Sequence, residues 1–385
     1  NTNISGQVPD TTLPPSINPA DDPAAGALPS SPVVPNIRDT FELAMYEPLR
    51  IPSRFIDDPQ GNSNEISLSF FAYDREFNLS LIPHELTAEN GQALSPNGSS
   101  QNQLKLYSGT LDDAENSWVR LSINASNEIT GAIYDGQELF LIDATSIVQA
   151  ATNIAHYNTD NTPTSIYKLS DVTTKKGTCS SQAATNSTYS YKQLVGELEQ
   201  AFAPQFAQGA SRQLNILLVA DTQYIASSNG NTQAQVLSQM NIIDGIFSEQ
   251  MGVQLKISQL VELPNNGTLT SSDPQGLLRQ FNTYVNRNYD NPGLAHLFTG
   301  RDLNGNVIGI AYLSAICGTN GTGLTQAGGR GTFGALTAAH EFGHNFGAPH
   351  DNQNGSVCVS TPGDFLMNPS LNGSSIFSQC SRNQM

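Results

Sequence analysis

Two patterns of apolar and polar residues divide the chain. Between about residues 39 and 147, apolar positions alternate with polar ones. Because the side chains of a strand point alternately to opposite faces, this period of two predicts antiparallel strands with one buried face. The clearest runs are Ile66–Phe70, Phe77–Leu81, Trp118–Ile123, Ile129–Tyr134 and Leu139–Leu141. We therefore expect a β-rich domain over residues 39–147.

The C-terminal part alternates between strand and helix patterns. Strands are predicted at 214–220, 253–262, 294–299 and 307–313, and helices at about 230–251, 274–287 and 332–346. Strands that alternate with helices favour a mixed α/β sheet. This domain is expected to cover residues 211–385.

Two segments show neither pattern. Residues 1–38 are rich in Pro, Asn, Asp and Ala, which is typical of an extended leader. Residues 148–210 form a polar linker with one helical stretch near 191–203. The expected order is therefore leader, β-rich domain, linker and α/β domain.

The composition of the chain argues against nucleic-acid-binding and membrane-spanning proteins. The 385 residues carry a net charge of −17, which argues against a nucleic-acid partner because phosphate binding needs a basic face. No run of 18 apolar residues predicts a membrane span. Lysine is scarce and Asn, Ser, Thr and Gly are abundant, so we expect a secreted protein. No charged-then-apolar leader opens the chain, so any signal peptide has been removed or is not part of this sequence. The low cysteine count favours a bacterial source.

The candidate chemistry lies in the run HEFGHNFGAPHD at 340–351. His340 and His344 are four residues apart, so on a helix both rings lie on one face and can bind one metal ion. Glu341 follows the first ligand, within reach of a water at the metal. Gly347 permits a sharp turn that returns His350 as a third ligand. Three histidines with an open fourth position are typical of catalytic zinc. The alternative, surface histidines on an ordinary helix, fits this extended pattern poorly.

This run, followed by Met367-Asn368-Pro369-Ser370-Leu371, resembles the adamalysin/reprolysin (ADAM-like) branch of the metzincin proteases. Asp351 after the third histidine resembles the marker of that branch. The resemblance covers roughly residues 210–385, and a looser one identifies residues 39–147 as similar to a reprolysin propeptide. The rival hypotheses are another metzincin with the same histidines, and a non-catalytic binding protein with a relic site.

The resemblance implies a secreted, monomeric zinc endopeptidase present as a latent proenzyme with its propeptide as inhibitor. It implies a twisted five-stranded sheet with one antiparallel edge strand, which we place near Gly323, Leu324 and Thr325, where an extended protein substrate would bind. Glu341 would be the general base, and Gly347 and Asp351 would support the third ligand. Met367 would form the Met-turn beneath the zinc. The side-chain pocket would be lined by Pro369, Ser370 and Leu371.

The four cysteines leave two interpretations open. Family positions imply a Cys317–Cys380 disulfide. Cys179, in the linker, then either coordinates the zinc as a cysteine switch or forms a disulfide with Cys358. Position before the protease domain favours the switch, and the even count of cysteines favours the disulfide.

A second metal is a weaker hypothesis. Cys380 and Asn383 have the spacing of a calcium site in the family, but Asn215 and Gly293 stand where family carboxylates are expected. Chance spacing is therefore the better interpretation. His84, His156 and His296 are expected to be ordinary surface or structural histidines.

Overall fold

The fold is described from a computed structural model. It describes residues 41–50, 65–88, 104–152, 162–174, 178–183, 212–290, 292–328, 331–370 and 374–385. All of the described residues belong to one compact unit. The predicted leader and the predicted helix at 191–203 lie outside the described residues.

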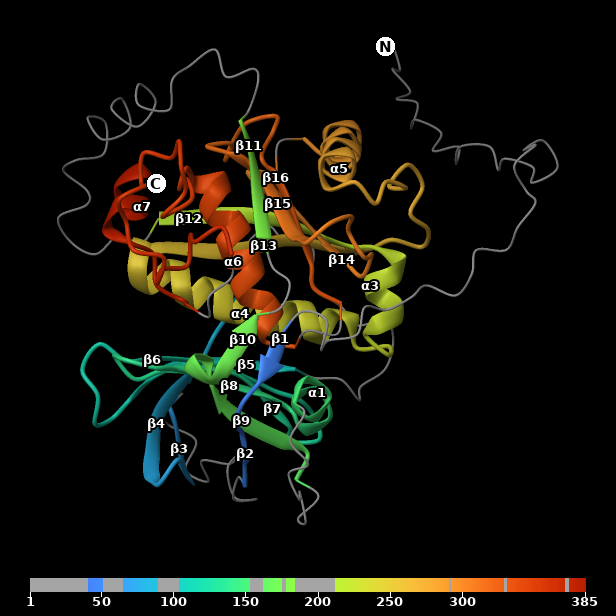
Figure 1. The fold of residues 1–385 in the computed structure, drawn as a ribbon. Coiled ribbons are helices and arrows are strands. Elements are labelled where there is room, and N and C mark those ends of the chain that lie inside the picture. The colour runs from blue at the N-terminus through green and yellow to red at the C-terminus, as the bar shows by residue number, and fades with distance from the viewer. Residues whose placement is uncertain are drawn as a thin grey trace, which may run out of the picture. The chain divides into compact units, whose positions relative to one another are not determined.

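An eight-stranded antiparallel sheet forms the N-terminal part (Figure 1). Its spatial order is β2-β9-β8-β7-β6-β5-β4-β3. The predicted alternation is confirmed in β3 and β4, whose buried residues occur at every second position, whereas every residue of β6 is buried. The strands are β2 (Glu47–Pro48), β3 (Ile66–Ala72), β4 (Arg75–Pro83), β5 (Lys105–Leu111), β6 (Trp118–Ile123), β7 (Ile129–Tyr134), β8 (Leu139–Ala144) and β9 (Thr164–Lys168).

Short elements border this sheet. Helix α1 (Thr145–Ala151) follows β8, and the 3-10 turn η3 (Leu169–Asp171) follows β9. Strand β1 (Phe41–Leu43) pairs with β10 (Val172–Thr174) in a separate antiparallel ladder. The ring of Phe41 packs in a tilted arrangement against that of Phe333, the first residue of the helix that carries the histidines, at 4.7 Å between ring centroids.

The second sheet has six strands, in the order β11-β15-β16-β14-β12-β13. Four of its five strand pairs are parallel, and the pair β15–β16 is antiparallel. The predicted mixed sheet is therefore confirmed. Five strands follow residue 211, namely β12 (Arg212–Ala220), β13 (Val253–Glu262), β14 (Leu294–Thr299), β15 (Val307–Leu313) and β16 (Thr322–Gln326). The sixth, β11 (Thr178–Ala183), comes from the preceding segment and pairs with β15.

The predicted position of the edge strand is wrong. Gly323, Leu324 and Thr325 lie in β16, between β14 and β15, and all are buried. The chain passes first to the outer position as β15 and then returns between β14 and β15. Sequence order alone does not fix this spatial order. The antiparallel strand is β15, whose outer side carries β11.

The helices cover both faces of the second sheet. Helix α5 (Pro274–Asn288) packs with Leu303 and Tyr312 into one apolar cluster. Helices α4 (Thr232–Met251) and α6 (Phe333–Phe346) lie on the other face. The remaining helices are α3 (Thr222–Ser227) and α7 (Gln379–Gln384).

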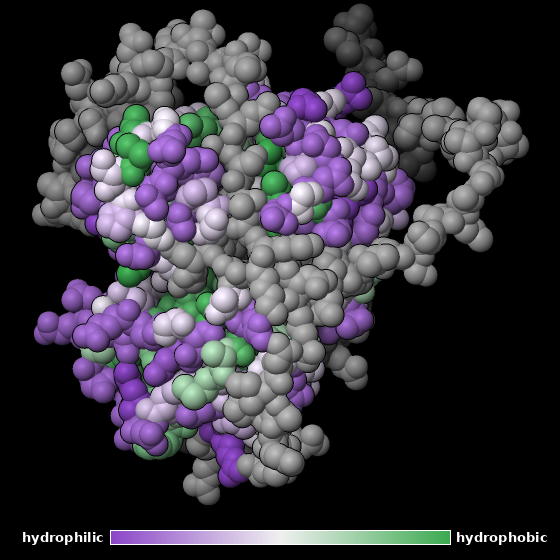
Figure 2. Space-filling view, viewed as in Figure 1, coloured by the Kyte–Doolittle hydropathy of each residue, from purple (hydrophilic) through white to green (hydrophobic). Residues whose placement is uncertain are grey.

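One apolar core spans the two sheets. Strands β5, β6 and β7 pack against α4 (Figure 1), and Trp118 and Leu141 share a cluster with Met240 and Phe342. The outer surface on the side seen in Figure 2 is mostly hydrophilic, with only scattered hydrophobic residues.

Candidate metal centre

Helix α6 presents the first two histidines on one face, as their spacing predicted. Their Nε2 atoms are 3.1 Å apart. The Nε2 atom of His350 lies 3.0 Å from that of His344 and 3.2 Å from that of His340. Tetrahedral zinc with bonds of ~2.05 Å separates its ligand atoms by about 3.3 Å. The three nitrogens therefore have nearly the separation that one metal ion requires.

The opposite nitrogen of each ring is already in a hydrogen bond. Nδ1 of His340 lies 2.7 Å from the Leu366 carbonyl, and Nδ1 of His344 lies 2.8 Å from the Ala348 carbonyl. Nδ1 of His350 lies 2.6 Å from Oε1 of Gln353. Since carbonyl oxygens only accept, Nδ1 carries the proton and Nε2 keeps its lone pair for a metal.

Burial keeps the rings neutral. Burial, and secondarily the neighbouring His350, lower the pKa of His340 to about 3. Burial and the two other histidines lower the pKa of His344 far below its usual range. Burial also lowers the pKa of His350. Neutral rings with converging lone pairs repel one another unless a cation lies between them, so the donor set fits a bound metal.

Glu341 lies beside this triad, fully buried on α6. A Cβ at Gly309 of β15 would overlap Oε1 of Glu341, so this approach requires glycine. Strand β11 brings Cys179 into register with the same residue, because Cys179 is the pairing partner of Gly309. The side chain of Cys179 is outside the described residues.

The predicted supporting residues surround the third histidine. Gly347 ends α6 with φ of 119°, and a Cβ there would lie 2.7 Å from the Gln384 carbonyl. Oδ1 of Asp351 accepts hydrogen bonds from the hydroxyls of Ser378 (2.8 Å) and Ser381 (3.2 Å). These bonds attach α7 to the histidine loop.

Met367 lies beneath α6. A Cβ at Gly343 would be 2.6 Å from Sδ of Met367, which is fully buried. The Met367 carbonyl accepts from the Asp351 amide at 2.9 Å. Pro369 and Ser370 follow directly, and the side-chain amide of Asn368 donates to the Ser370 carbonyl at 2.9 Å. Leu371 lies outside the described residues.

Both predicted disulfides that involve Cys380 or Cys358 are wrong. The structure joins Cys358 to Cys380, and Cys317 is an exposed free thiol. The Cys317–Cys380 pairing came from family positions, but here the chain brings Cys358 to α7 instead. The Cys179–Cys358 alternative fails because Cys358 already has a partner.

No contact among the described residues adds support to the calcium site that the spacing of Cys380 and Asn383 suggested. Oδ1 of Asn383 accepts from Gln379, and Oδ1 of Asn215 accepts from Gln213. Among the described residues, the only cluster of three His, Cys, Asp or Glu side chains that could hold an ion is the histidine triad.

The other histidines lie away from the triad. Nε2 of His84 lies 3.0 Å from Oδ2 of Asp244. The buried ring of His296 forms a hydrogen bond of 3.0 Å between its Nε2 and the hydroxyl of Thr325. Burial lowers the pKa of His296 to about 3. His156 lies outside the described residues.

Sequence reasoning missed two residues that fix the site. Gln353 orients His350, and its only signal was a polar residue three positions after the ligand. Asp143 of β8 accepts hydrogen bonds from the backbone amide (3.0 Å) and hydroxyl (2.5 Å) of Thr332, which precedes α6. No local motif connects positions 189 residues apart.

The Nε2 atoms of three neutral histidines converge beside Glu341, which lies on the helix of the first two, and this donor set fits one metal ion. Residues 210–379 match the reprolysin model of metallo-peptidase family M12. This part of the chain is therefore similar to the reprolysin/ADAM-like metallopeptidases.

Similar proteins include the disintegrin and metalloproteinase domain-containing protein 10 of Homo sapiens and of Bos taurus. Each is 29% identical over 164 residues, which is 34% of this chain. The match spans only 21% of the length of those relatives.

Solved structures give weaker likenesses. Metalloproteinase-II from Bacteroides fragilis aligns with 84% of this chain and 91% of its own, at 14% identity and a TM-score of 0.46. A chain from a chaperone–substrate complex aligns with 44% of this chain and 30% of its own, at 15% identity and a TM-score of 0.33. Within the described residues, no helix is both long and apolar enough to cross a membrane.

Proposed function

We propose that this chain is the latent precursor of a secreted zinc endopeptidase. The observation that carries the proposal is the convergence of three neutral histidine Nε2 atoms within 3.0–3.2 Å of one another, beside the buried Glu341. The family of residues 210–379 supports peptide-bond hydrolysis as the reaction. The Cys358–Cys380 disulfide supports an oxidising compartment. The bacterial source stays a prediction.

The chain's own residues supply binding and proton transfer. His340, His344 and His350 would hold zinc, which when bound supplies a Lewis acid that polarises the scissile carbonyl. The Glu341 carboxylate accepts a proton from the attacking water and passes it to the nitrogen of the leaving amine. Met367 packs beneath α6 as the Met-turn and holds the histidine loop through its carbonyl.

An extended substrate would bind along β15. Among the five described strands that follow residue 211, β15 and β13 lie at the two ends, and β11 covers the outer side of β15. A peptide that replaces β11 would use the same backbone groups of β15 and would pass Gly309, beside Glu341. Pro369, Ser370 and Leu371 would line its side-chain pocket.

Latency follows from the same pairing. Because β11 pairs with β15, the segment before the protease domain covers the strand that a substrate needs. Cys179 pairs with Gly309, the residue against which Glu341 packs. This register supports Cys179 as the thiolate that blocks the zinc in the latent form.

Glu341→Gln tests the catalytic assignment. The variant should fold and bind one zinc ion per chain, yet lose at least a thousandfold of its hydrolysis of a denatured protein substrate. It should also stay uncut where the wild type processes itself. Glu262→Gln, at an exposed residue of β13, is the matched control and should keep wild-type activity. Activity of Glu341→Gln near that of the wild type rejects the assignment.

Thiol titration tests the switch. In a Cys317→Ser background the Cys358–Cys380 disulfide leaves Cys179 as the only thiol. It should react slowly in the zinc-loaded chain and fully after a chelator is added. Adding Cys179→Ser should remove the released thiol and raise the activity of the uncut chain. Full reaction without the chelator contradicts the switch.

A further inference from the structure

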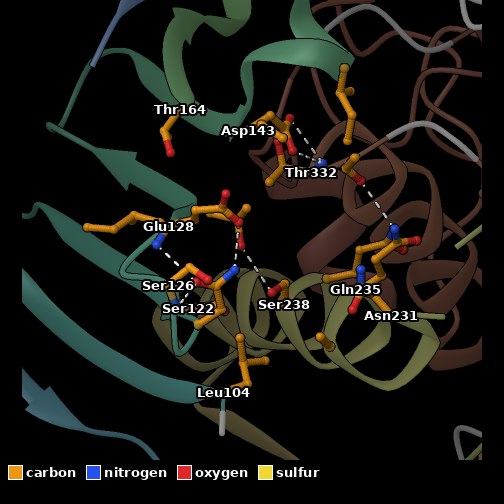
Figure 3. A pocket seen from close by; sticks show the side chains of 18 of the residues that line it. Leu104, Ser122, Ser126, Glu128, Asp143, Thr164, Asn231, Gln235, Ser238 and Thr332 are labelled. Atoms are coloured by element: carbon orange, nitrogen blue, oxygen red, sulfur yellow. Dashed lines mark hydrogen bonds between the residues drawn. The ribbon is translucent and has the colours of Figure 1, made fainter. Parts of the chain in front are cut away.

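A cavity of about 220 Å³ lies between the N-terminal sheet and helix α4, away from the histidine triad. One wall comes from β6, β7 and β8, and the other from α4 and the residues just before α6 (Figure 3). The two walls meet where the hydroxyl oxygens of Thr130 and Ser238 form a hydrogen bond of 3.1 Å. The cavity thus exists only while the sheet is docked on α4.

Two buried polar atoms in its walls lack partners among the described residues. They are Oγ of Ser122 and Oε1 of Gln239. Ser122 is 0% exposed and Gln239 is 3% exposed. Gln239 already donates its Nε2 to the Gly331 carbonyl at 3.1 Å, so its remaining capacity is that of an acceptor. A buried polar atom without a partner costs roughly 1–3 kcal/mol, so these atoms favour a polar ligand.

The charge of the walls defines that ligand. Glu128 lies at the exposed mouth and Asp143 lies at the buried end. Among the described residues that line the cavity, none is Lys, Arg or His. Two carboxylates and an amide oxygen accept hydrogen bonds, so the complementary molecule is a cation with several N–H donors.

Size separates an organic cation from a metal ion. A liquid water occupies about 30 Å³, so the cavity has room for roughly seven waters or a small organic molecule. A hard metal ion takes about six to eight oxygens at ~2.1–2.6 Å. In the described chain, no third carboxylate joins Glu128 and Asp143.

We propose that this cavity binds a small organic cation of the diamine or guanidinium class and thereby strengthens the docking of the N-terminal sheet on the protease domain. The ligand contacts both walls, so it binds the docked form and not the separated one. Mass action then stabilises docking as the ligand concentration exceeds its dissociation constant. The binding itself does not depend on the proposed protease activity.

The test titrates the full chain with 1,4-diaminobutane at constant ionic strength and follows both the melting temperature and the heat of binding. Neutral 1,4-butanediol is the isostere, and calcium chloride is the metal arm. We expect saturable binding of the diamine, a rise in melting temperature of several degrees, and neither effect from the diol or calcium.

Two variants define the site. Glu128→Gln, at an exposed residue, should weaken diamine binding at least tenfold without loss of fold, and Ser122→Ala should weaken it severalfold. Glu115→Gln, at an exposed residue outside the cavity, should leave the affinity unchanged. The proposal is overturned if the diol matches the diamine, if calcium alone binds, if the diamine does not bind, or if Glu128→Gln binds it as tightly as the wild type.

Discussion

Gly309 of β15 lies against the carboxylate of Glu341, so closely that a Cβ at this position would overlap Oε1. The strand that would receive the substrate and the helix that carries the general base therefore touch where the chain has no side chain. Any side chain at position 309 must displace the carboxylate.

Gly309→Ala should lower hydrolysis of peptide substrates by roughly 100-fold, because a shift of about 1 Å in a catalytic group has that effect. Zinc binding should be unchanged, since the histidines are not contacted. Gly318→Ala is the matched control, because a Cβ there meets only the Ala315 carbonyl, at 3.4 Å. Equal activity of the two variants would show that Glu341 does not act from this position.

Gln353→Ala should weaken zinc binding by about 10- to 100-fold, because Gln353 fixes the ring of His350 through a bond of 2.6 Å to Nδ1. Competition with a coloured chelator measures the affinity. Asn354→Ala, next to it and exposed, should bind zinc as the wild type does. If both variants keep full affinity, His350 is held by its backbone alone.

Breaking the Cys358–Cys380 disulfide should lower the free energy of unfolding by about 3 kcal/mol, since it closes a loop across a sequence separation of 22. Urea unfolding of a Cys358→Ser/Cys380→Ser variant measures the loss. Cys317→Ser should have little effect because Cys317 is an exposed free thiol. A larger loss from Cys317→Ser than from the double variant would contradict the observed pairing.

Asp143 should make stability depend on pH. Burial raises the pKa of Asp143 from 3.8 to about 6, so the folded chain holds this proton more tightly than the unfolded chain does. Its contribution to stability is complete below about pH 4 and falls as pH rises to about 6, by roughly 3 kcal/mol in total. The charged form must then accept from Thr332 and Tyr167 without water.

Asp143→Asn keeps the shape and removes this titration. Compared with the variant, the wild type should lose about 3 kcal/mol of unfolding free energy between pH 4 and pH 7, as measured by urea unfolding at each pH. For Asp113→Asn, at an exposed residue, the unfolding free energy should change with pH as it does in the wild type. Parallel curves for wild type and Asp143→Asn would contradict the raised pKa.

Local patterns predicted the elements well. The strands at 253–262, 294–299 and 307–313 match β13, β14 and β15 residue for residue, and the histidine spacing predicted the face of α6. The spacing of apolar residues along a strand or helix involves only residues that are close in the sequence, so it can be recognised from the sequence alone. The same holds for Gly347, whose turn follows from its own backbone.

Long-range relationships were not predictable in this way. The edge strand was misplaced because β15 and β16 exchange their spatial order relative to the chain. The pairing of Cys358 with Cys380 depends on where α7 packs, and Asp143, which accepts hydrogen bonds from Thr332, lies in the N-terminal sheet, 189 residues earlier. Each of these contacts is set by tertiary packing, for which neither residue's sequence neighbours carry a signal.

The apolar core that joins the N-terminal sheet to α4 and α6 affects how soon activity would appear after the chain is cut. A single cut between residues 183 and 212 would break the chain but none of the contacts among Trp118, Leu141, Met240 and Phe342. The two pieces would stay together as a non-covalent complex. Activation would then lag behind cleavage, with a delay set by the dissociation rate of that complex and lengthened by a high protein concentration.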